Sequence, residues 1–305
     1  MDEATGARMN HYQNCTLCPR KCGVDRENAR GICGESNVLR VARASLHMWE
    51  EPCLSGDVGS GTVFFTGCNL GCIYCQNYNI THEHHGKEIT IWRLAEIFLE
   101  LQEKGAANIN LVTAVHFTPH IIKALDIARK QGLKLPIVYN SSGYERPETL
   151  KMLDGYIDIY LPDYKYFDPV LSKKFSFAPD YPSVVKEALR EMFRQVGTPV
   201  FDAEGMMKKG MIVRHLVLPS HTADSMNILS DLYETFGDDI YISIMSQYTP
   251  CKRFEDTPEL SRKLTRYEYK KVTDFAEKLG IKNGFLQSGE AAKESFIPDF
   301  DERGV

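Results

Sequence analysis

The chain has 305 residues, of which 43% are hydrophobic, and this is enough apolar sequence for one large core. Its formal net charge of -5 at pH 7 gives no electrostatic basis for nucleic-acid binding. The sequence shows neither a run of about 18 apolar residues nor the apolar core of a signal peptide, so we expect a cytoplasmic protein without a membrane segment.

The nine cysteines are distributed unevenly. In a reducing cytosol, clustered cysteines are more often metal ligands or redox groups than disulfides. Seven of the nine fall into two groups, one near the N-terminus and one around residue 70. Cys53 and Cys251 stand alone, and we interpret both as small buried hydrophobic residues.

The N-terminal group consists of Cys15, Cys18, Cys22 and Cys33, spaced C-x2-C-x3-C-x10-C. Four thiolates can satisfy a zinc ion or a closed iron–sulfur cluster. Structural zinc favours two C-x2-C pairs and only one is present, while Cys18 followed by proline is typical of ferredoxin-type runs. We predict a metal centre, zinc or iron–sulfur, in an arm spanning residues 1–58; the alternative is four free thiols in a disordered arm.

The second group lies in the stretch TGCNLGCIYCQN, where Cys68, Cys72 and Cys75 follow a strand-like run at 62–66. In a parallel α/β barrel, chemistry gathers where strands end at their carboxyl edge. A loop this short can wrap three thiolates around a cubane iron–sulfur cluster and leave the fourth iron without a protein ligand. Such an open iron can bind a substrate or cofactor and pass it one electron.

Short β-branched or aromatic runs alternate with helical patterns along the rest of the chain. The predicted strands are 62–66, 109–113, 135–140, 157–161, 212–219 and 240–245. Between the first two, residues 90–105 carry apolar side chains at helical spacing and end at Gly105, a candidate left-handed C-cap. This alternation predicts an α/β fold, a full or partial (β/α)6 barrel over residues 59–250, with a doubly wound open sheet as the alternative.

Two segments depart from the alternation. Residues 198–216 contain two strand-like runs on either side of Glu204 and Gly205, which predicts an inserted hairpin before the fifth strand. Residues 251–305 are predicted to form a C-terminal helix and tail packed on the barrel.

The cysteine loop resembles the signature of radical S-adenosylmethionine (SAM) enzymes, C-x3-C-x-aromatic-C, through Cys68, Cys72, Tyr74 and Cys75. The strings CTLCPRKCGVDR, EEPCLSGDVGSGTVFFTGCNLGCIYCQN, VRHLVLP and YISIMSQYTP resemble the group related to pyruvate formate-lyase activating enzymes, over nearly the whole chain. The resemblance implies a partial TIM-like barrel, a [4Fe-4S] cluster on the three cysteines and SAM as cofactor.

The resemblance also implies a reaction. The reduced cluster would cleave SAM to methionine and a 5'-deoxyadenosyl radical, which abstracts hydrogen from a glycine of a partner glycyl-radical enzyme, or from a small molecule or peptide. The cluster would need a low potential, so a flavodoxin or ferredoxin reductant and an anaerobic setting are expected. A non-catalytic iron–sulfur electron carrier, or a metal-dependent interaction module, is the alternative of another class.

Candidate cofactor-binding residues follow the ends of the predicted strands. The Gly-Gly-Glu motif of the activating enzymes is absent from VTAVHFT, so Thr113, His116 or nearby backbone carbonyls would take over its contact with the methionine amino group; an ordinary strand-end histidine is the alternative for His116. Asn140 and Ser141 stand where those enzymes place an acid followed by threonine. The family's D-x-K motif is matched by Asp163 and Lys165.

Arg214 lies inside the apolar run of the fifth predicted strand. A buried guanidinium requires an anionic partner, and the cofactor carboxylate is a natural one. Gln247 follows the sixth strand and faces the same mouth, with a turn-forming role as the alternative. Tyr74 and Asn77 of the signature loop complete the predicted cofactor-binding set.

Overall fold

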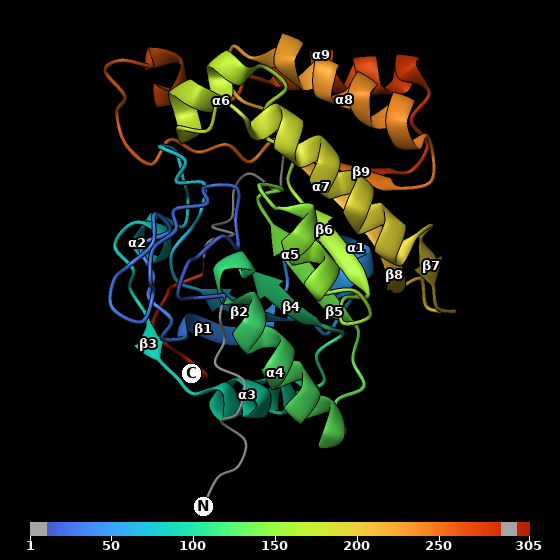
Figure 1. The fold of residues 1–305 in the computed structure, drawn as a ribbon. Helices are drawn as coiled ribbons and strands as arrows, with labels where there is room; N and C mark the ends of the chain where they lie inside the picture. Colours follow the sequence, from blue (N-terminus) through green and yellow to red (C-terminus); the bar gives the residue numbers. More distant parts are fainter. Residues whose placement is uncertain (1–10, 288–297) are drawn as a thin grey trace, which may run out of the picture.

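One ten-stranded sheet forms the centre of the computed structural model, which describes residues 11–287 and 298–305 (Figure 1). Its strands are β1 (Arg40–His47), β2 (Ser60–Phe65), β3 (Lys87–Glu88), β4 (Ile109–Val112), β5 (Ile137–Ser141), β6 (Ile159–Pro162), β7 (Val200–Phe201), β8 (Met207–Leu216), β9 (Tyr241–Met245) and β10 (Gly284–Leu286). The strand order is β10-β9-β8-β6-β5-β4-β2-β1-β3, with β7 paired to β8. Neighbours from β2 to β10 run parallel, whereas β1 pairs antiparallel with both β2 and β3.

The six predicted strands are all present, as β2, β4, β5, β6, β8 and β9. Every residue of β2, β4, β5 and β6 is buried, as expected of parallel strands covered on both faces. In the described part of the chain the end strands β3 and β10 do not pair with each other, so the sheet curls into a partial barrel. The predicted α/β barrel class is confirmed.

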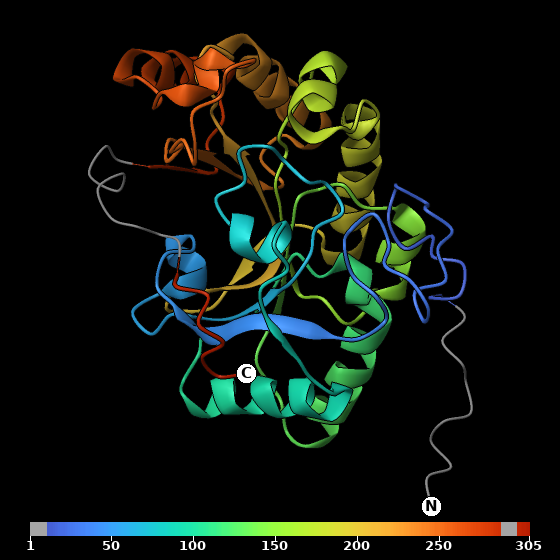
Figure 2. The same ribbon diagram turned by 90° about the vertical axis from the view of Figure 1, so that its left-hand side faces the viewer.

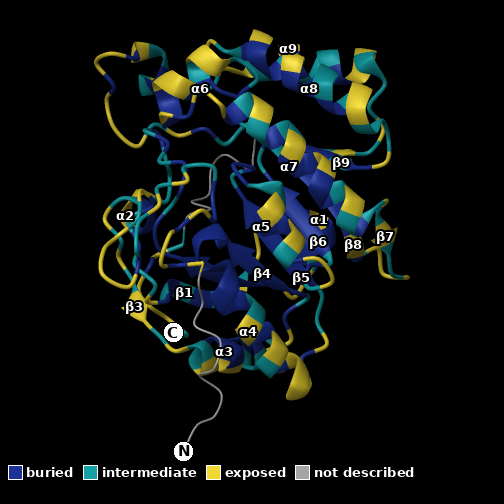
Figure 3. Ribbon diagram, in the orientation of Figure 1, coloured by how far each residue is buried: buried dark blue, intermediate teal, exposed yellow. Residues whose placement is uncertain are grey.

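Helices cover the outside of the sheet, with buried inner faces and exposed outer faces (Figure 3). They are α1 (Pro52–Ser55), α2 (Tyr78–Thr81), α3 (Ile91–Glu103), α4 (Thr118–Lys130), α5 (Pro147–Met152), α6 (Pro169–Ser176), α7 (Tyr181–Val196), α8 (Thr222–Phe236) and α9 (Arg266–Leu279), with 3-10 turns η1 (Val115–Phe117) and η2 (Pro258–Ser261). In α3, the Thr90 side chain accepts a hydrogen bond from the Arg93 amide, and Gly105 lies just beyond the C-cap at φ +82°. Among the described helices, none is long and apolar enough to cross a membrane.

Elements outside the six predicted strands extend the sheet. β7 and β8 pair antiparallel, which confirms the inserted hairpin. β1 lies in the segment predicted as an N-terminal arm, and β10 lies in the segment predicted as a C-terminal helix and tail. Near the C-terminus, the Phe300 ring packs edge-on against Phe64 at 5.3 Å. Both end segments therefore contribute to the central layer, while the domain boundaries at 58 and 250 stay a prediction.

The part of the arm between residues 11 and 39 contains no helix or strand. It runs as turns along one side of the barrel, beside α4 and α5 (Figure 2). The Thr149 hydroxyl of α5 donates a hydrogen bond to the Leu17 carbonyl at 2.7 Å, and Met152 packs on a small cluster around Tyr12 and Leu17. The arm is thus fixed to the outside of the sheet by a few specific contacts.

Candidate functional site

The signature loop, residues 66–77, connects the carboxyl end of β2 to the start of α2. Gly67 and Gly71 take φ angles of +74° and +72°, a region that favours glycine. At Gly67 an added Cβ would lie 2.5 Å from Cγ of Glu35 and 2.7 Å from the Cys33 carbonyl oxygen, so no larger residue fits. The loop is therefore held tightly against the N-terminal arm.

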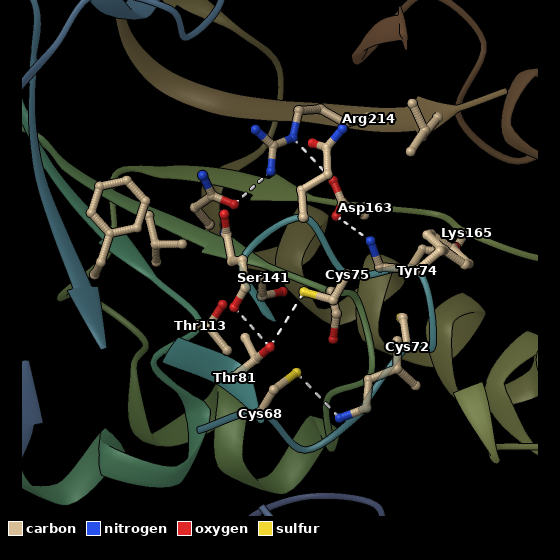
Figure 4. Close-up of a pocket in the computed structure, with 18 of the residues that line it drawn as sticks. Cys68, Cys72, Tyr74, Cys75, Thr81, Thr113, Ser141, Asp163, Lys165 and Arg214 are labelled. Carbon is tan, nitrogen blue, oxygen red and sulfur yellow. Dashed lines mark hydrogen bonds and ion pairs between the residues drawn. The ribbon is translucent and has the colours of Figure 1, made fainter. Parts of the chain in front are cut away.

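The three loop cysteines line one pocket at the carboxyl edge of the sheet (Figure 4). Each sulfur accepts a hydrogen bond: Cys68 from the Leu70 amide at 3.4 Å, Cys72 from the Ser176 hydroxyl at 3.0 Å, and Cys75 from the Thr81 hydroxyl at 3.4 Å. Donors aimed at sulfur suit a thiolate better than a neutral thiol.

Burial raises the pKa of the Cys68 thiol and raises that of Cys75 to about 12, and the nearby Cys72 adds to both effects. Three adjacent thiolates, one buried and two partly buried, therefore require a cation to neutralise them, which a metal cluster supplies. In the part of the chain that the structure describes, no three His, Cys, Asp or Glu side chains converge as the ligands of a single ion do. Three cysteine thiolates can each bind a different iron of a cubane, so the donor set of this loop suits a [4Fe-4S] cluster.

A charged network lies across the pocket from the cysteines (Figure 4). Arg214 of β8 donates to Asp163 Oδ1 at 3.0 Å, to Glu50 Oε2 at 3.1 Å and to Asn140 Oδ1 at 2.6 Å. Lys165 Nζ lies 2.6 Å from Asp163 Oδ2. The carboxyl ends of β5, β6 and β8 thus bring Asn140, the Asp163–Lys165 pair and Arg214 together, and Glu50 joins them from the segment that follows β1.

The environment keeps Asp163 ionised. Burial alone would raise the pKa of this carboxyl, but Lys165 and Arg214 outweigh burial and hold it below its usual range. Burial opposes the charge of Lys165 as well, yet Asp163 raises the pKa of that ammonium above its ordinary value. For Glu50, burial raises the pKa even though Arg214 acts against the rise.

Most of the predicted cofactor-binding residues meet in this pocket. Its lining includes Tyr74, Asn77, Thr113, Asn140, Ser141, Asp163, Lys165, Arg214 and Gln247 together with the three cysteines. Thr113 follows β4 at φ +58°, a conformation that is strained for a β-branched residue and is typical of functional sites. The structure thus gathers strand-end residues from the whole carboxyl edge of the barrel.

His116 lies apart from these residues. It is 1% exposed, does not line the pocket, and its Nε2 lies 2.7 Å from the Thr66 carbonyl oxygen. Burial, with a contribution from Arg26, lowers the pKa of its imidazole to about 3. The neutral ring therefore ties η1 to the start of the signature loop, and this geometry gives no support to a contact with the cofactor.

The structure also changes the expected partner of Arg214. The sequence led us to pair this guanidinium with the carboxylate of a cofactor, but Glu50 and Asp163 already supply two protein carboxylates. Glu50 was not among the predicted site residues. Its only sequence signal is the acidic pair in MWEEP, placed after β1, a strand that the sequence analysis did not predict.

Comparison with known proteins adds to this geometry. A family model of the Radical SAM superfamily matches residues 62–226, more than half of the chain. An uncharacterized protein of Methanocaldococcus jannaschii is 29% identical over 279 residues, covering 89% of this chain and 77% of the relative.

Similar solved structures include SuiB of Streptococcus suis, with a TM-score of 0.47 and 13% identity over 76% of this chain and 49% of SuiB. Methylornithine synthase PylB has a TM-score of 0.46 and 13% identity over 72% of this chain and 68% of PylB. This chain thus spans about half the length of SuiB. On the match of the family model, the chain belongs to the radical SAM superfamily.

Proposed function

We propose that this protein cleaves SAM reductively at a [4Fe-4S] cluster on Cys68, Cys72 and Cys75 and uses the product to abstract hydrogen from a substrate. The observation that carries the proposal is the pocket in which three hydrogen-bonded cysteines face a partly buried network of opposite charges. When bound, the cluster and SAM supply a one-electron cleavage that yields a 5'-deoxyadenosyl radical. The protein residues bind, orient and shield these groups.

Lys165 is the residue best placed to receive the cofactor carboxylate. An ammonium has three donors, and within the described residues Asp163 occupies one of them. The charge of Arg214, by contrast, is already matched by two protein carboxylates, Glu50 and Asp163. We assign Arg214 to positioning Asp163 and Asn140, and through Asp163 to orienting Lys165.

The remaining lining residues divide between the two ends of the cofactor. Tyr74 and Asn77 lie on the cysteine loop, whereas Ser141 ends β5 and Thr113 and Gln247 follow strands. In the absence of a Gly-Gly-Glu motif, backbone carbonyls beside Thr113 and the carboxylate of Glu50 are the acceptors that we propose for the methionine amino group. Glu50 Oε1 accepts from Asn110 Nδ2 at 2.9 Å, which holds the carboxylate in a fixed orientation.

The substrate class is a further part of the proposal. The strings shared with activating enzymes favour a glycine of a partner glycyl-radical enzyme as the hydrogen donor, and a small molecule or peptide is the second candidate. A low-potential flavodoxin or ferredoxin would supply the electron. A non-catalytic electron carrier would not need the charged network beside the cysteines, so that network favours the enzyme.

The test is to measure 5'-deoxyadenosine after anaerobic reconstitution with iron and sulfide and reduction with dithionite. The comparison is a triple variant carrying Cys68→Ala, Cys72→Ala and Cys75→Ala. Cys251→Ala is the matched control because that cysteine is exposed; the interpretation of Cys251 as a buried hydrophobic residue is wrong, whereas Cys53 is buried. We expect product from the wild type and from the control only. Equal product from the wild type and the triple variant would refute the proposal.

A further inference from the structure

The N-terminal arm has a defined conformation although it lacks the secondary structure and the large apolar core that usually stabilise one. Between residues 11 and 39 it has no helix or strand, and its own buried cluster consists of Tyr12, Cys15 and Leu17. So small an apolar cluster provides little folding free energy, and segments of this kind are usually held by disulfides or metals. The four arm cysteines are free thiols in the structure.

These cysteines lie in one folded stretch of the arm. Cys15, Cys18 and Cys33 are buried and Cys22 is partly buried. Backbone hydrogen bonds between Cys15 and Gly23, and between Cys15 and Val24, fold the first three cysteines back on themselves.

Gly31 shows how the fourth cysteine joins the group. A Cβ added at Gly31 would lie 3.4 Å from the Cys33 sulfur and 3.5 Å from that of Cys22. Two sulfurs that are eleven positions apart therefore converge on one glycine, whose missing side chain leaves room between them. The Cys18 carbonyl accepts a hydrogen bond from the Lys21 amide at 3.0 Å, which closes a turn between Cys18 and Cys22.

Arg26 indicates the charge that this centre must carry. Its side chain is completely buried, and among the described residues no carboxylate lies within salt-bridge distance of it. The guanidinium donates to the backbone carbonyls of Glu35, Ser36 and His116 and stacks over the Tyr12 ring at 4.7 Å. Its Nη1 lies 3.9 Å from the Cys15 sulfur. A buried cation without an anion is strongly unfavourable, so the adjacent sulfur is the natural site of negative charge.

We propose that Cys15, Cys18, Cys22 and Cys33 bind a metal centre as four thiolates and that Arg26 is its buried counter-cation. Four thiolates around a zinc ion, or around a [4Fe-4S] cluster in its oxidised form, leave a net charge of about -2. Arg26 neutralises part of that charge at the sulfur that it contacts. As at the signature loop, the sulfurs do not converge as the ligands of one ion do in the described residues, so a zinc ion would require them to move closer together, whereas each can bind a separate iron of a cluster.

This centre is joined to the signature loop by backbone contacts. The Cys68 amide donates to the Cys33 carbonyl at 3.2 Å, so a ligand of one group is hydrogen-bonded to a ligand of the other. Arg26 also donates to the His116 carbonyl at 2.6 Å, and His116 in turn pairs with Thr66 just before the loop. The loaded arm therefore acts as a support against which the signature loop is held.

The test uses the triple variant, in which metal can be assigned to the arm alone, after anaerobic supply of iron and sulfide and, separately, of zinc. About one zinc per chain, or about four irons with equal acid-labile sulfide, supports the proposal and identifies the metal. Neither metal in stoichiometric amount overturns it. Because this readout is the metal content of the triple variant, and the test of the proposed function is 5'-deoxyadenosine formation by the wild type, the two can fail separately.

The role of Arg26 is tested in the same background. We expect Arg26→Met to lose at least about tenfold more metal to a chelator, Arg26→Lys to retain it, and Arg30→Met, at an exposed position of the same arm, to match the parent. Equal retention by Arg26→Met and Arg30→Met would overturn the counter-cation role. If Arg26→Met does not fold, Cys22→Ala decides the metal site: loss of metal supports it, and full retention overturns it.

Discussion

The two cysteine groups rest on different kinds of support. Cys68, Cys72 and Cys75 lie on a loop that leaves β2, a strand in which every residue is buried. Cys15, Cys18, Cys22 and Cys33 lie in an arm without regular structure between residues 11 and 39. The sheet fixes the first group before any metal binds, whereas the second group has little besides its proposed metal to fix it. The difference suggests that metal removal acts on chemistry in the first group and on folding in the second.

The strongest test of this difference is to remove one cysteine ligand from each group in turn. In Cys72→Ala we expect 5'-deoxyadenosine formation to fall to background while the arm metal stays bound. In Cys22→Ala we expect the arm metal to be lost and product formation to decrease only in part, because the Cys68 contact is to the Cys33 backbone. Product and metal content of both variants are measured side by side; complete inactivity of Cys22→Ala would place the arm centre within the active site.

Arg214 tests how far the charged network belongs to cofactor binding. Arg214→Met removes three charge-assisted or polar contacts and leaves Glu50 and Asp163 with one cation fewer. We expect SAM affinity to fall by about 10- to 150-fold, equivalent to about 1.5 to 3 kcal/mol. Equilibrium binding is measured together with chemical unfolding of the same variant. A normally folded variant with wild-type affinity would restrict Arg214 to a structural role.

His116 connects the two regions, and its protonation makes the free energy of unfolding depend on pH. The native state keeps this imidazole neutral down to a pKa of about 3, while the unfolded chain takes up a proton near the ordinary value of 6.5. As the pH falls below 6.5 the unfolded state binds more protons, so stability decreases by about 1.4 kcal/mol per pH unit. Between pH 7 and pH 5, the free energy of unfolding of His116→Gln should therefore decrease by about 2 kcal/mol less than that of the wild type.

The pH experiment compares free energies of unfolding at pH 7 and pH 5. His85→Gln is the matched control because His85 is exposed. The free energy of unfolding of this control should decrease between pH 7 and pH 5 by the same amount as that of the wild type. An unchanged acid loss in His116→Gln would show that His116 is not the group that links stability to pH.

The hydrogen bonds to sulfur give the smallest expected effect. Ser176→Ala removes the 3.0 Å donor to Cys72 without touching a ligand. Removal of such an outer contact should weaken cluster retention by about tenfold and lower the reduction potential, since hydrogen bonds to sulfur stabilise the reduced cluster. Chelator competition and redox titration measure both quantities, with Ser183→Ala as the exposed control. Equal cluster retention and equal reduction potentials in the two variants would show that Ser176 does not influence the cluster.

Local patterns predicted much of the fold. Buried β-branched runs identified β2, β4, β5, β6, β8 and β9, because parallel strands covered on both faces must be apolar throughout. β1 escaped prediction because its run RVARASLH mixes charged and apolar residues, and some of its residues are only partly buried or exposed. β10 is only three residues long and its pairing with β9 depends on a contact distant in sequence.

The sequence predicted only part of the candidate site, because some of its contacts join residues that are distant in sequence. Position after a strand end placed Asp163, Lys165 and Asn140 in the same pocket, because parallel strands end at one edge. Position could not show which side chains pair. Glu50 reaches Arg214 across 164 residues of sequence, and only the folded sheet reveals that contact.

The most direct test of the central claim is electron paramagnetic resonance of the dithionite-reduced wild type before and after addition of SAM. A cluster on Cys68, Cys72 and Cys75 with an open iron should change its signal when the cofactor binds, and the triple variant should show no cofactor-dependent change. An arm cluster, fully ligated by four cysteines, should give the same signal with and without SAM. A wild-type signal that SAM leaves unaltered would contradict the assignment of these three cysteines to a SAM-binding cluster.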